Sequence, residues 1–464
     1  MSTETAYDDA LDELGAALAE MSFDSLDEET IAATRQRIFD TLGATAIGLE
    51  TPEGHALKTS LPTPAGNGVP RSAAELIGLY VGATRTTEID DIDIASCTTA
   101  GAVVVPVALA IANAENRDDR RLIAAVVAGY EAMLRIGRAI GGATILYRGV
   151  WPTYVTASLG AAATTAHLLG LDGEATANAL ALAAAATSVP PASAFADPAA
   201  RYQALGLTAI GGAAAAYAAA AGTDAGLDAF ERYGQRLSVR IDVAEVVRPD
   251  GARWLIREVD TKLFPTSRQA LASIEAFVSL APELPDPPEI ERIIVHVPST
   301  YRDMVDRPSL PSQRIESMIG VQYAMALALV HPGVLYDVVR AELPQEQQIV
   351  DLIRKIEVRA SPQLDTLFPR TWGSTVTVHR ASGQLMTQEV LEPSGSRSHE
   401  LDWRKLGRKV ARVYAVGGLA NAQFVNLLLA RCRGLATNDA MRSAGELLGL
   451  IKDAHGWATE RNSG

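Results

Sequence analysis

The sequence has few cysteines, few aromatic residues and no concentration of positive charge, and each shortage argues against a class of protein. Two cysteines, Cys97 and Cys432, in 464 residues make neither a disulfide framework nor a thiolate metal site. A formal net charge of −14 argues against a nucleic-acid partner, which would require a basic face. With aromatic residues at 5% and hydrophobic residues at 48%, we expect a globular protein whose helices pack through small residues.

The sequence motifs of cofactor-dependent enzymes are also missing. There is no Walker loop, no paired-glycine dinucleotide fingerprint, and no HExxH or GxSxG pattern. The seven histidines are scattered without metal-ligand spacing, so we interpret them as ordinary surface or core residues. We therefore expect no metal and no cofactor, and a small-molecule substrate whose chemistry is acid–base work by side chains.

No segment has the character of a membrane-directing sequence. The N-terminus is acidic and polar, without the basic and apolar regions of a secretory signal. The stretch 205–222 approaches the length of a membrane span, but it is mostly alanine and glycine, and membrane insertion depends on Leu, Ile, Phe and Val. The sequence predicts a buried helix here, no membrane partner and a cytoplasmic protein.

The hydrophobic pattern predicts a mainly α-helical protein with a smaller α+β domain. Residues 1–261 carry helical periodicity, interrupted by loops at 61–70 and 189–198. Beyond them, the stretches 290–297, 356–358, 374–379 and 384–390 alternate as strands do, and the last two are expected to form a hairpin. A helix is expected from Ser317 to Val330, and helical patterning returns at Asp402. We expect a helical domain of residues 1–261 and 402–464, and an α+β domain of residues 262–401.

Three carboxylates, Asp90, Asp91 and Asp93, stand just before an apolar run that begins at Gly101. Carboxylates so close to a hydrophobic segment must be solvated, capped or paired, because burying an unpaired charge is costly. A helix N-terminus is one place that favours negative charge. We interpret this acidic turn as one wall of an active site.

An ordered series of short motifs resembles the MmgE/PrpD family, which includes 2-methylcitrate dehydratase, cis-aconitate decarboxylase and iminodisuccinate epimerase. The series comprises Asp40-x-x-Gly43, the acidic turn before Gly101-x4-Pro106, Gly129-Tyr130-Glu131, Leu168-Leu169-Gly170-Leu171-Asp172, Gly206-x5-Gly212, Lys262-Leu263-Phe264-Pro265 and Gln322-Tyr323-Ala324. The resemblance spans nearly the whole chain. It implies a large helical domain, a smaller lid domain, an active site in the cleft between them, a homodimer and no cofactor.

The resemblance implies four catalytic residues. Lys262 and Tyr323 match a family lysine and tyrosine, and Asp91 and Asp93 match the family acids. Lysine is scarce in this chain, and a lysine desolvated at a domain boundary can act as a base. The alternatives are structural: an ordinary ion pair for the lysine, a core position for the tyrosine, and caps or salt bridges for the two acids.

The resemblance also marks places where a family residue is replaced. Thr99 and Trp151 stand where family members have histidines, and Arg201 stands where they have a lysine. Neither threonine nor tryptophan transfers protons near neutral pH as histidine does, so the pocket is expected to be more apolar and these residues to bind substrate. Arg148 and Arg268 are further candidate carboxylate contacts. Each of the five has a structural alternative in the core or in a helix turn.

Three functions therefore remain open. The first is a cofactor-independent lyase that eliminates water or carbon dioxide from a carboxylate substrate. The second is an isomerase, epimerase or cyclase that uses the same scaffold on a larger, less charged substrate, and a more apolar pocket favours it. The third is a protein that binds without catalysis.

Overall fold

The computed structural model describes residues 3–60, 70, 72–188, 200–226, 228–249, 251–284, 289–419, 422–438 and 441–455. The predicted loop at 189–198 lies outside these residues, as does the loop at 61–70 except for Pro70. The chain divides into two compact units. Unit 1 consists of Met1–Thr86, Asp90–Val259 and Asn421–Gly464, and unit 2 of Thr87–Ile89 and Asp260–Ala420.

Unit 1 is helical, as predicted. Its α-helices are α1 (Thr3–Glu20), α2 (Glu28–Gly48), α3 (Pro52–Ser60), α4 (Ala73–Arg85), α5 (Gly101–Ala114), α6 (Asp119–Ala139), α7 (Ala143–Leu146), α8 (Pro152–Leu169), α9 (Gly173–Ala186), α10 (Ala200–Ala220), α11 (Ala229–Leu237), α12 (Val243–Val246), α19 (Ala422–Arg433) and α20 (Ala444–Ala454). Short 3₁₀ turns occur at η1 (Phe23–Ser25) and η2 (Leu255–Glu258). Asp27, Asp118 and Asp172 begin α2, α6 and α9 by accepting a hydrogen bond from a backbone N–H of the first turn.

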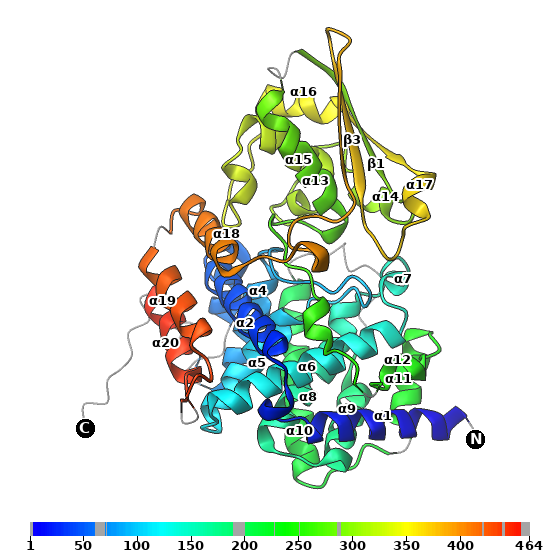
Figure 1. Ribbon diagram of the computed structural model, residues 1–464, viewed down its shortest axis with the longest axis vertical. Helices are drawn as coiled ribbons and strands as arrows, with labels where there is room; N and C mark the ends of the chain where they lie inside the picture. Colours follow the sequence, from blue (N-terminus) through cyan, green and yellow to red (C-terminus); the bar gives the residue numbers. More distant parts are fainter. Residues whose placement is uncertain are drawn as a thin grey trace. The chain divides into compact units, whose positions relative to one another are not determined.

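The core of unit 1 is built on α5, α6, α8 and α10, which pack against one another (Figure 1). α10 is long and apolar enough by length and composition to cross a membrane, and 44% of its most apolar window is buried. Two of its glycines lie against neighbouring backbone. A Cβ atom on Gly206 would come within 2.4 Å of the Gly78 carbonyl oxygen, and one on Gly212 within 2.0 Å of the Ser158 carbonyl oxygen. One face of α10 therefore packs closely against α4 and α8 through small residues, whereas Leu207 on the same helix is 60% exposed, so the helix is buried only in part.

Unit 2 combines helices with one small sheet, which confirms the predicted α+β region. Its helices are α13 (Arg268–Leu280), η3 (Ala281–Glu283), α14 (Ser299–Val305), η5 (Glu316–Met318), α15 (Val321–Val330), η6 (Val334–Tyr336), α16 (Gln347–Lys355), α17 (Pro362–Asp365), η7 (Arg397–His399) and α18 (Trp403–Val416). Its strands are β1 (Ile290–Val297), β2 (Ile356–Ala360), β3 (Ser374–Arg380) and β4 (Leu385–Val390).

The sheet of unit 2 has the strand order β2-β1-β3-β4. β1 runs parallel to β2 and antiparallel to β3, and β3 and β4 form the predicted antiparallel hairpin. Val295 lies opposite both Val358 of β2 and Val376 of β3, and all three are buried. Figure 1 shows α13 and α15 beside this sheet, where α13 contacts β3 and β4.

Two features of unit 2 differ from the sequence prediction. The helix expected from Ser317 is interrupted at Gly320, so that α15 begins only at Val321. The residues after Asp402 were expected to join the helical domain, yet α18 belongs to unit 2. There the Arg412 guanidinium lies 4.6 Å from the centre of the Tyr336 ring, a cation–π contact that ties α18 to η6.

Candidate active site

The side chain of Asp91 is held at the start of α5 in unit 1. One of its oxygens accepts a hydrogen bond from the Gly101 backbone N–H at 3.0 Å, and the other accepts one from the Tyr130 hydroxyl at 2.5 Å. Asp91 is 1% exposed, and this burial raises the pKa of its carboxyl to about 6, although Arg37 and the Tyr130 hydrogen bond act in the opposite direction. Asp91 therefore exchanges its proton closer to neutral pH than an exposed aspartate does.

The other two acids of the turn are paired with arginines. Asp93 forms an ion pair with Arg138 at 2.9 Å, and it also accepts a hydrogen bond from the Ser96 backbone N–H at 2.7 Å. Asp90 forms an ion pair with Arg85 at 2.5 Å, and Asp90 is fully buried. The acidic turn thus consists of two paired carboxylates on either side of Asp91, which accepts hydrogen bonds from the Tyr130 hydroxyl and the Gly101 amide.

Trp151 is the N-cap residue of α8, and two arginines from different helices place their guanidinium groups near its ring. The Arg85 guanidinium, at the end of α4, lies 5.6 Å from the ring centre, and the Arg201 guanidinium, in the first turn of α10, lies 5.4 Å from it. Arg201 also donates a hydrogen bond to the Tyr202 hydroxyl at 2.9 Å. The ring therefore serves as a platform for two cations, because its face attracts positive charge.

Thr99 belongs to the same region of unit 1. Its backbone N–H donates to the Thr153 hydroxyl at 3.2 Å, and the two hydroxyl oxygens are 3.3 Å apart. Thr153 follows Trp151 by two residues in the first turn of α8. Thr99, Trp151 and Arg201 thus lie in one region of unit 1. We call Arg85, Trp151, Arg201 and Thr99 the Trp151 cluster.

Arg148 is placed differently. Its guanidinium donates a hydrogen bond to the Ser238 carbonyl at 3.0 Å in an exposed position. The contacts of Arg148 therefore connect the turn before α8 with the end of α11, which is the structural alternative weighed for this residue.

Lys262 lies in unit 2 and is almost completely buried, with 1% of its side chain exposed. Its ammonium nitrogen is 3.4 Å from a carboxylate oxygen of Glu88 and 3.5 Å from the Thr266 carbonyl oxygen. Sequence reasoning missed Glu88. The available signal was its place two residues before Asp90, at the start of the same acidic stretch.

Tyr323 and Arg268 also lie in unit 2. The Tyr323 hydroxyl donates to the Pro344 carbonyl at 3.0 Å, and burial raises its pKa to about 12 while Arg340 acts in the opposite direction. Arg268 forms a buried ion pair with Asp260 at 2.9 Å, and its guanidinium lies 5.9 Å from the Trp372 ring centre. A neutral tyrosine fits a proton donor, whereas the ion pair of Arg268 fits a structural position.

Two family models cover most of the chain. The model of the MmgE/PrpD N-terminal domain matches residues 12–237, and that of the MmgE/PrpD C-terminal domain matches residues 264–428. The chain belongs to the MmgE/PrpD family. It is also 26% identical over 372 residues to "Cis-aconitate decarboxylase-like protein oryM" of Aspergillus oryzae (strain ATCC 42149 / RIB 40), a match that covers 74% of this chain and 76% of that protein. The motif-based prediction of the family is confirmed.

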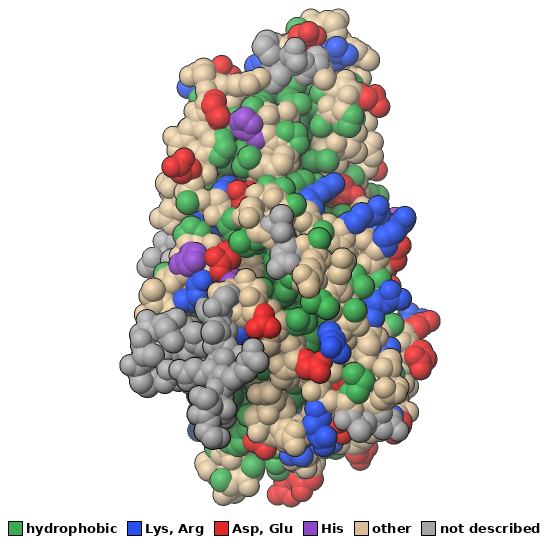
Figure 2. All heavy atoms as spheres, turned by 90° about the vertical axis from the view of Figure 1, so that its left-hand side faces the viewer, with side chains coloured by type: hydrophobic (Ala, Val, Ile, Leu, Met, Phe, Trp, Pro, Cys, Tyr) green, Lys and Arg blue, Asp and Glu red, His purple; other side chains and the backbone are tan. Residues whose placement is uncertain are grey.

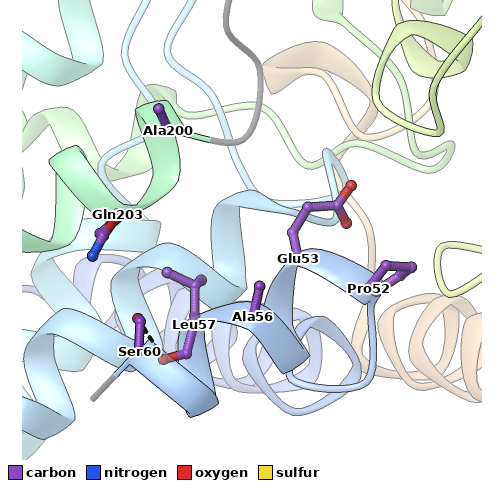
Figure 3. Close-up of a pocket in the computed structure, with 7 residues that line it drawn as sticks. All are labelled: Pro52, Glu53, Ala56, Leu57, Ser60, Ala200 and Gln203. Atoms are coloured by element: carbon purple, nitrogen blue, oxygen red, sulfur yellow. Dashed lines mark hydrogen bonds between the residues drawn. The ribbon is translucent and has the colours of Figure 1, made fainter. Parts of the chain in front are cut away.

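A surface pocket of this MmgE/PrpD protein lies near the start of α10 in unit 1. Its volume is about 400 Å³, and Figure 3 shows that its walls come from α3 and from the first turn of α10. The described lining consists of Pro52, Glu53, Ala56, Leu57, Ser60, Ala200 and Gln203. Because this lining holds a carboxylate and no cation, it does not suit an anionic ligand, and we do not place the substrate there.

The part of the chain that the structure describes contains no group of three or more His, Cys, Asp or Glu side chains that could hold a metal ion. On the face of the MmgE/PrpD protein shown in Figure 2, basic side chains are interspersed with acidic and neutral ones. The charged groups of the candidate active site are instead the carboxylates of the acidic turn and the two arginines beside Trp151.

Proposed function

We propose that this MmgE/PrpD protein is a cofactor-independent lyase that removes carbon dioxide or water from a small carboxylate substrate. The observation that carries the proposal is the Trp151 cluster, where the guanidinium groups of Arg85 and Arg201 lie 5.6 and 5.4 Å from one ring. Arg85 is paired with Asp90, but the half-buried Arg201 adds a cation at the same aromatic surface. This cation favours an anionic ligand rather than the larger, less charged ligand that the sequence had left open.

The two arginines of the Trp151 cluster differ in burial. Arg85 is 4% exposed and paired with the buried Asp90, so its charge is already balanced. Arg201 is half-buried, so part of its side chain is accessible to a ligand, and it contacts both Trp151 and Tyr202. We therefore assign Arg201 to binding a substrate carboxylate through two of its N–H donors. We assign Arg85 to fixing the position of the Trp151 ring.

Asp91, Tyr323 and Lys262 are proposed for the proton and charge chemistry. In a decarboxylation the C–C bond to the carboxylate breaks, its electron pair stays on the substrate carbon, and that carbon must then receive a proton. A carboxyl with a pKa of about 6 suits proton transfer near neutral pH, and the neutral Tyr323 hydroxyl suits donation. The Lys262 ammonium suits stabilisation of the negative charge that develops on the substrate.

Incubation with cis-aconitate in deuterated water tests the proposal, because a similar protein carries that substrate in its name. NMR spectra would show loss of carbon dioxide and one deuteron incorporated into the product for decarboxylation. Citrate-like hydroxy acids would reveal dehydration as new alkene signals. Deuterium exchange without elimination would support the isomerase alternative and refute the lyase, and no change in any of these substrates would refute the proposed substrate class.

An Arg201→Met variant tests the role of the Trp151 cluster. Loss of one charge-assisted carboxylate contact is expected to raise KM about 10- to 100-fold, because such contacts contribute roughly 1.5–3 kcal/mol. Arg232→Met is the matched control, since Arg232 is a half-exposed arginine of α11 paired with Asp228. An unchanged KM in Arg201→Met would exclude this carboxylate contact. The homodimer and the cytoplasmic location stay predictions, and light scattering in solution tests the first of them.

A further inference from the structure

We propose that Glu88 is the positioning residue for Lys262, holding it as an ammonium ion that stabilises negative charge on the substrate. The inference rests on the proposed function in one respect, since Lys262 is there assigned to the chemistry. It replaces the sequence-based expectation that a desolvated lysine acts as a base. The contacts within unit 2 carry the argument.

The first contact is the buried ion pair itself. Lys262 has 1% of its side chain exposed and Glu88 has 11%, and the two charged groups are 3.4 Å apart. A buried ammonium without a nearby anion is strongly unfavourable, and it loses its proton more readily. The Glu88 carboxylate and the Thr266 carbonyl, 3.5 Å from the same nitrogen, both stabilise the charged form. The nitrogen of Lys262 thus has a carboxylate and a backbone carbonyl as hydrogen-bond acceptors.

The backbone of Glu88 is the second observation. Its φ angle is +51°, in the left-handed region that residues other than glycine, asparagine and aspartate rarely adopt. Two hydrogen bonds hold the backbone on the C-terminal side of this residue's side chain. The Thr266 N–H donates to the Glu88 carbonyl at 3.2 Å, and the Lys409 ammonium donates to the Ile89 carbonyl at 2.8 Å. Such a conformation persists where surrounding contacts fix it, and here it directs the carboxylate to Lys262.

The same contacts extend to the segment that precedes α15. The Thr266 hydroxyl donates to the Met318 carbonyl at 3.0 Å, and the Ser267 N–H donates to the same carbonyl at 2.8 Å. α15 begins three residues after Met318 and carries Tyr323. Glu88 thus belongs to one hydrogen-bonded framework with Lys262 and with the residues leading to α15. A change at residue 88 should act on the chemistry through Lys262.

The chemical role follows from the charge state. An ammonium ion donates hydrogen bonds to a substrate oxygen that gains negative charge, and it keeps its proton throughout. No net proton transfer to Glu88 is required, because the carboxylate serves only as the counter-ion. Lys262 and Glu88 then form a neutral pair in the free protein, and a bound anionic substrate shares the ammonium with Glu88.

Three variants test this role. Glu88→Gln keeps the size of the side chain and removes its charge, Glu88→Asp keeps the charge on a shorter stem, and Glu88→Gly removes the carboxylate while permitting the positive φ. On cis-aconitate, Glu88→Gln and Glu88→Gly are expected to lower kcat about 100-fold with little change in KM, because they weaken a contact made to developing charge. Glu88→Asp should recover part of kcat.

A second measurement does not depend on turnover. Proton–nitrogen NMR of lysine side chains detects ammonium groups that are shielded from solvent, and Lys262→Met identifies the signal of Lys262. We expect this signal in the wild type and its loss in Glu88→Gln at the same pH. An unchanged signal in Glu88→Gln, or an unchanged kcat in Glu88→Gln and Glu88→Gly, would overturn the role of Glu88. If the wild type turns over no substrate while the signal behaves as expected, the proposed function fails and the Glu88–Lys262 pair stands.

Discussion

Replacing Asp91 with asparagine should change how the stability of the protein depends on pH. Asp91 is fully buried between the Gly101 N–H and the Tyr130 hydroxyl, and burial raises its pKa from an ordinary value of 3.8 to about 6. The folded state therefore binds the Asp91 proton more tightly than the unfolded state does. The stabilisation from this proton is complete below pH 3.8 and is lost as the pH rises through 6.

The size of the effect follows from the two pKa values. The difference between 3.8 and about 6 corresponds to about 3 kcal/mol in the free energy of unfolding. Most of the titration occurs between pH 4.5 and 7.5. As the pH rises over this range, the free energy of unfolding of the wild type should fall by about 2 kcal/mol relative to that of Asp91→Asn. Asparagine keeps an acceptor for the Gly101 N–H, so the variant is expected to fold.

Urea unfolding followed by tryptophan fluorescence at several pH values measures this difference directly. Subtracting the wild-type free energy from that of the variant removes the contribution of every other titrating group. Asp402→Asn is the matched control. The backbone N–H of Lys405 lowers the pKa of Asp402, so its stabilisation is present above pH 3.8 and is lost on acidification. The stability difference for Asp402→Asn should therefore change with pH in the opposite direction. A pH-independent difference for Asp91→Asn would refute the assignment of a raised pKa to this residue.

Two further predictions concern unit 1. Gly101→Ala should destabilise the protein by about 1–3 kcal/mol, because its Cβ would lie 2.5 Å from the Tyr130 hydroxyl and 2.8 Å from Asp91. Gly211 of α10 has open space around it, so Gly211→Ala should stabilise the protein by roughly 0.5–1 kcal/mol. Thermal unfolding of the two variants compares them, and equal effects would contradict the steric argument. His167 has its pKa lowered from 6.5 to about 4 by burial, so its stabilisation is present above pH 6.5 and is lost as the pH falls toward 4. As the pH falls from 7.5 to 4.5, the free energy of unfolding of His167→Asn should therefore rise by about 2–3 kcal/mol relative to that of the wild type in urea titrations. A difference between the two proteins that does not change with pH would count against a buried neutral histidine.

Local signals in the sequence were sufficient for most of the fold. Helix starts such as those at Asp27 and Asp118 depend on a side chain and a backbone N–H three residues later, so the pattern contains the whole interaction. Strands such as β1 follow from alternation. The interruption at Gly320 was missed, since an apolar run has the same pattern whether or not its backbone is continuous.

The candidate site could be predicted only in part, because its pairings join distant parts of the chain. The family motifs indicated Trp151 and Arg201, and the structure brings them within 5.4 Å of each other. The same motifs could not show that Arg85 also faces this ring, or that Glu88 lies beside Lys262. The expectation of a more apolar pocket followed from the residue types alone and did not include the guanidinium group of Arg85.

The three residues Thr87–Ile89 give unit 2 an unusual dependence on early sequence. Glu88 and Lys262 are 174 positions apart, and Ile89 and Lys409 are 320 apart, so unit 2 cannot complete these contacts until nearly the whole chain has been synthesised. Contacts of such long range slow folding, because the loop entropy is lost before the contact forms. A fragment spanning only 260–420 would fold around a buried lysine without its carboxylate. Unit 2 is therefore expected to mature late, and to be recovered as an isolated fragment only when residues 87–89 are supplied with it.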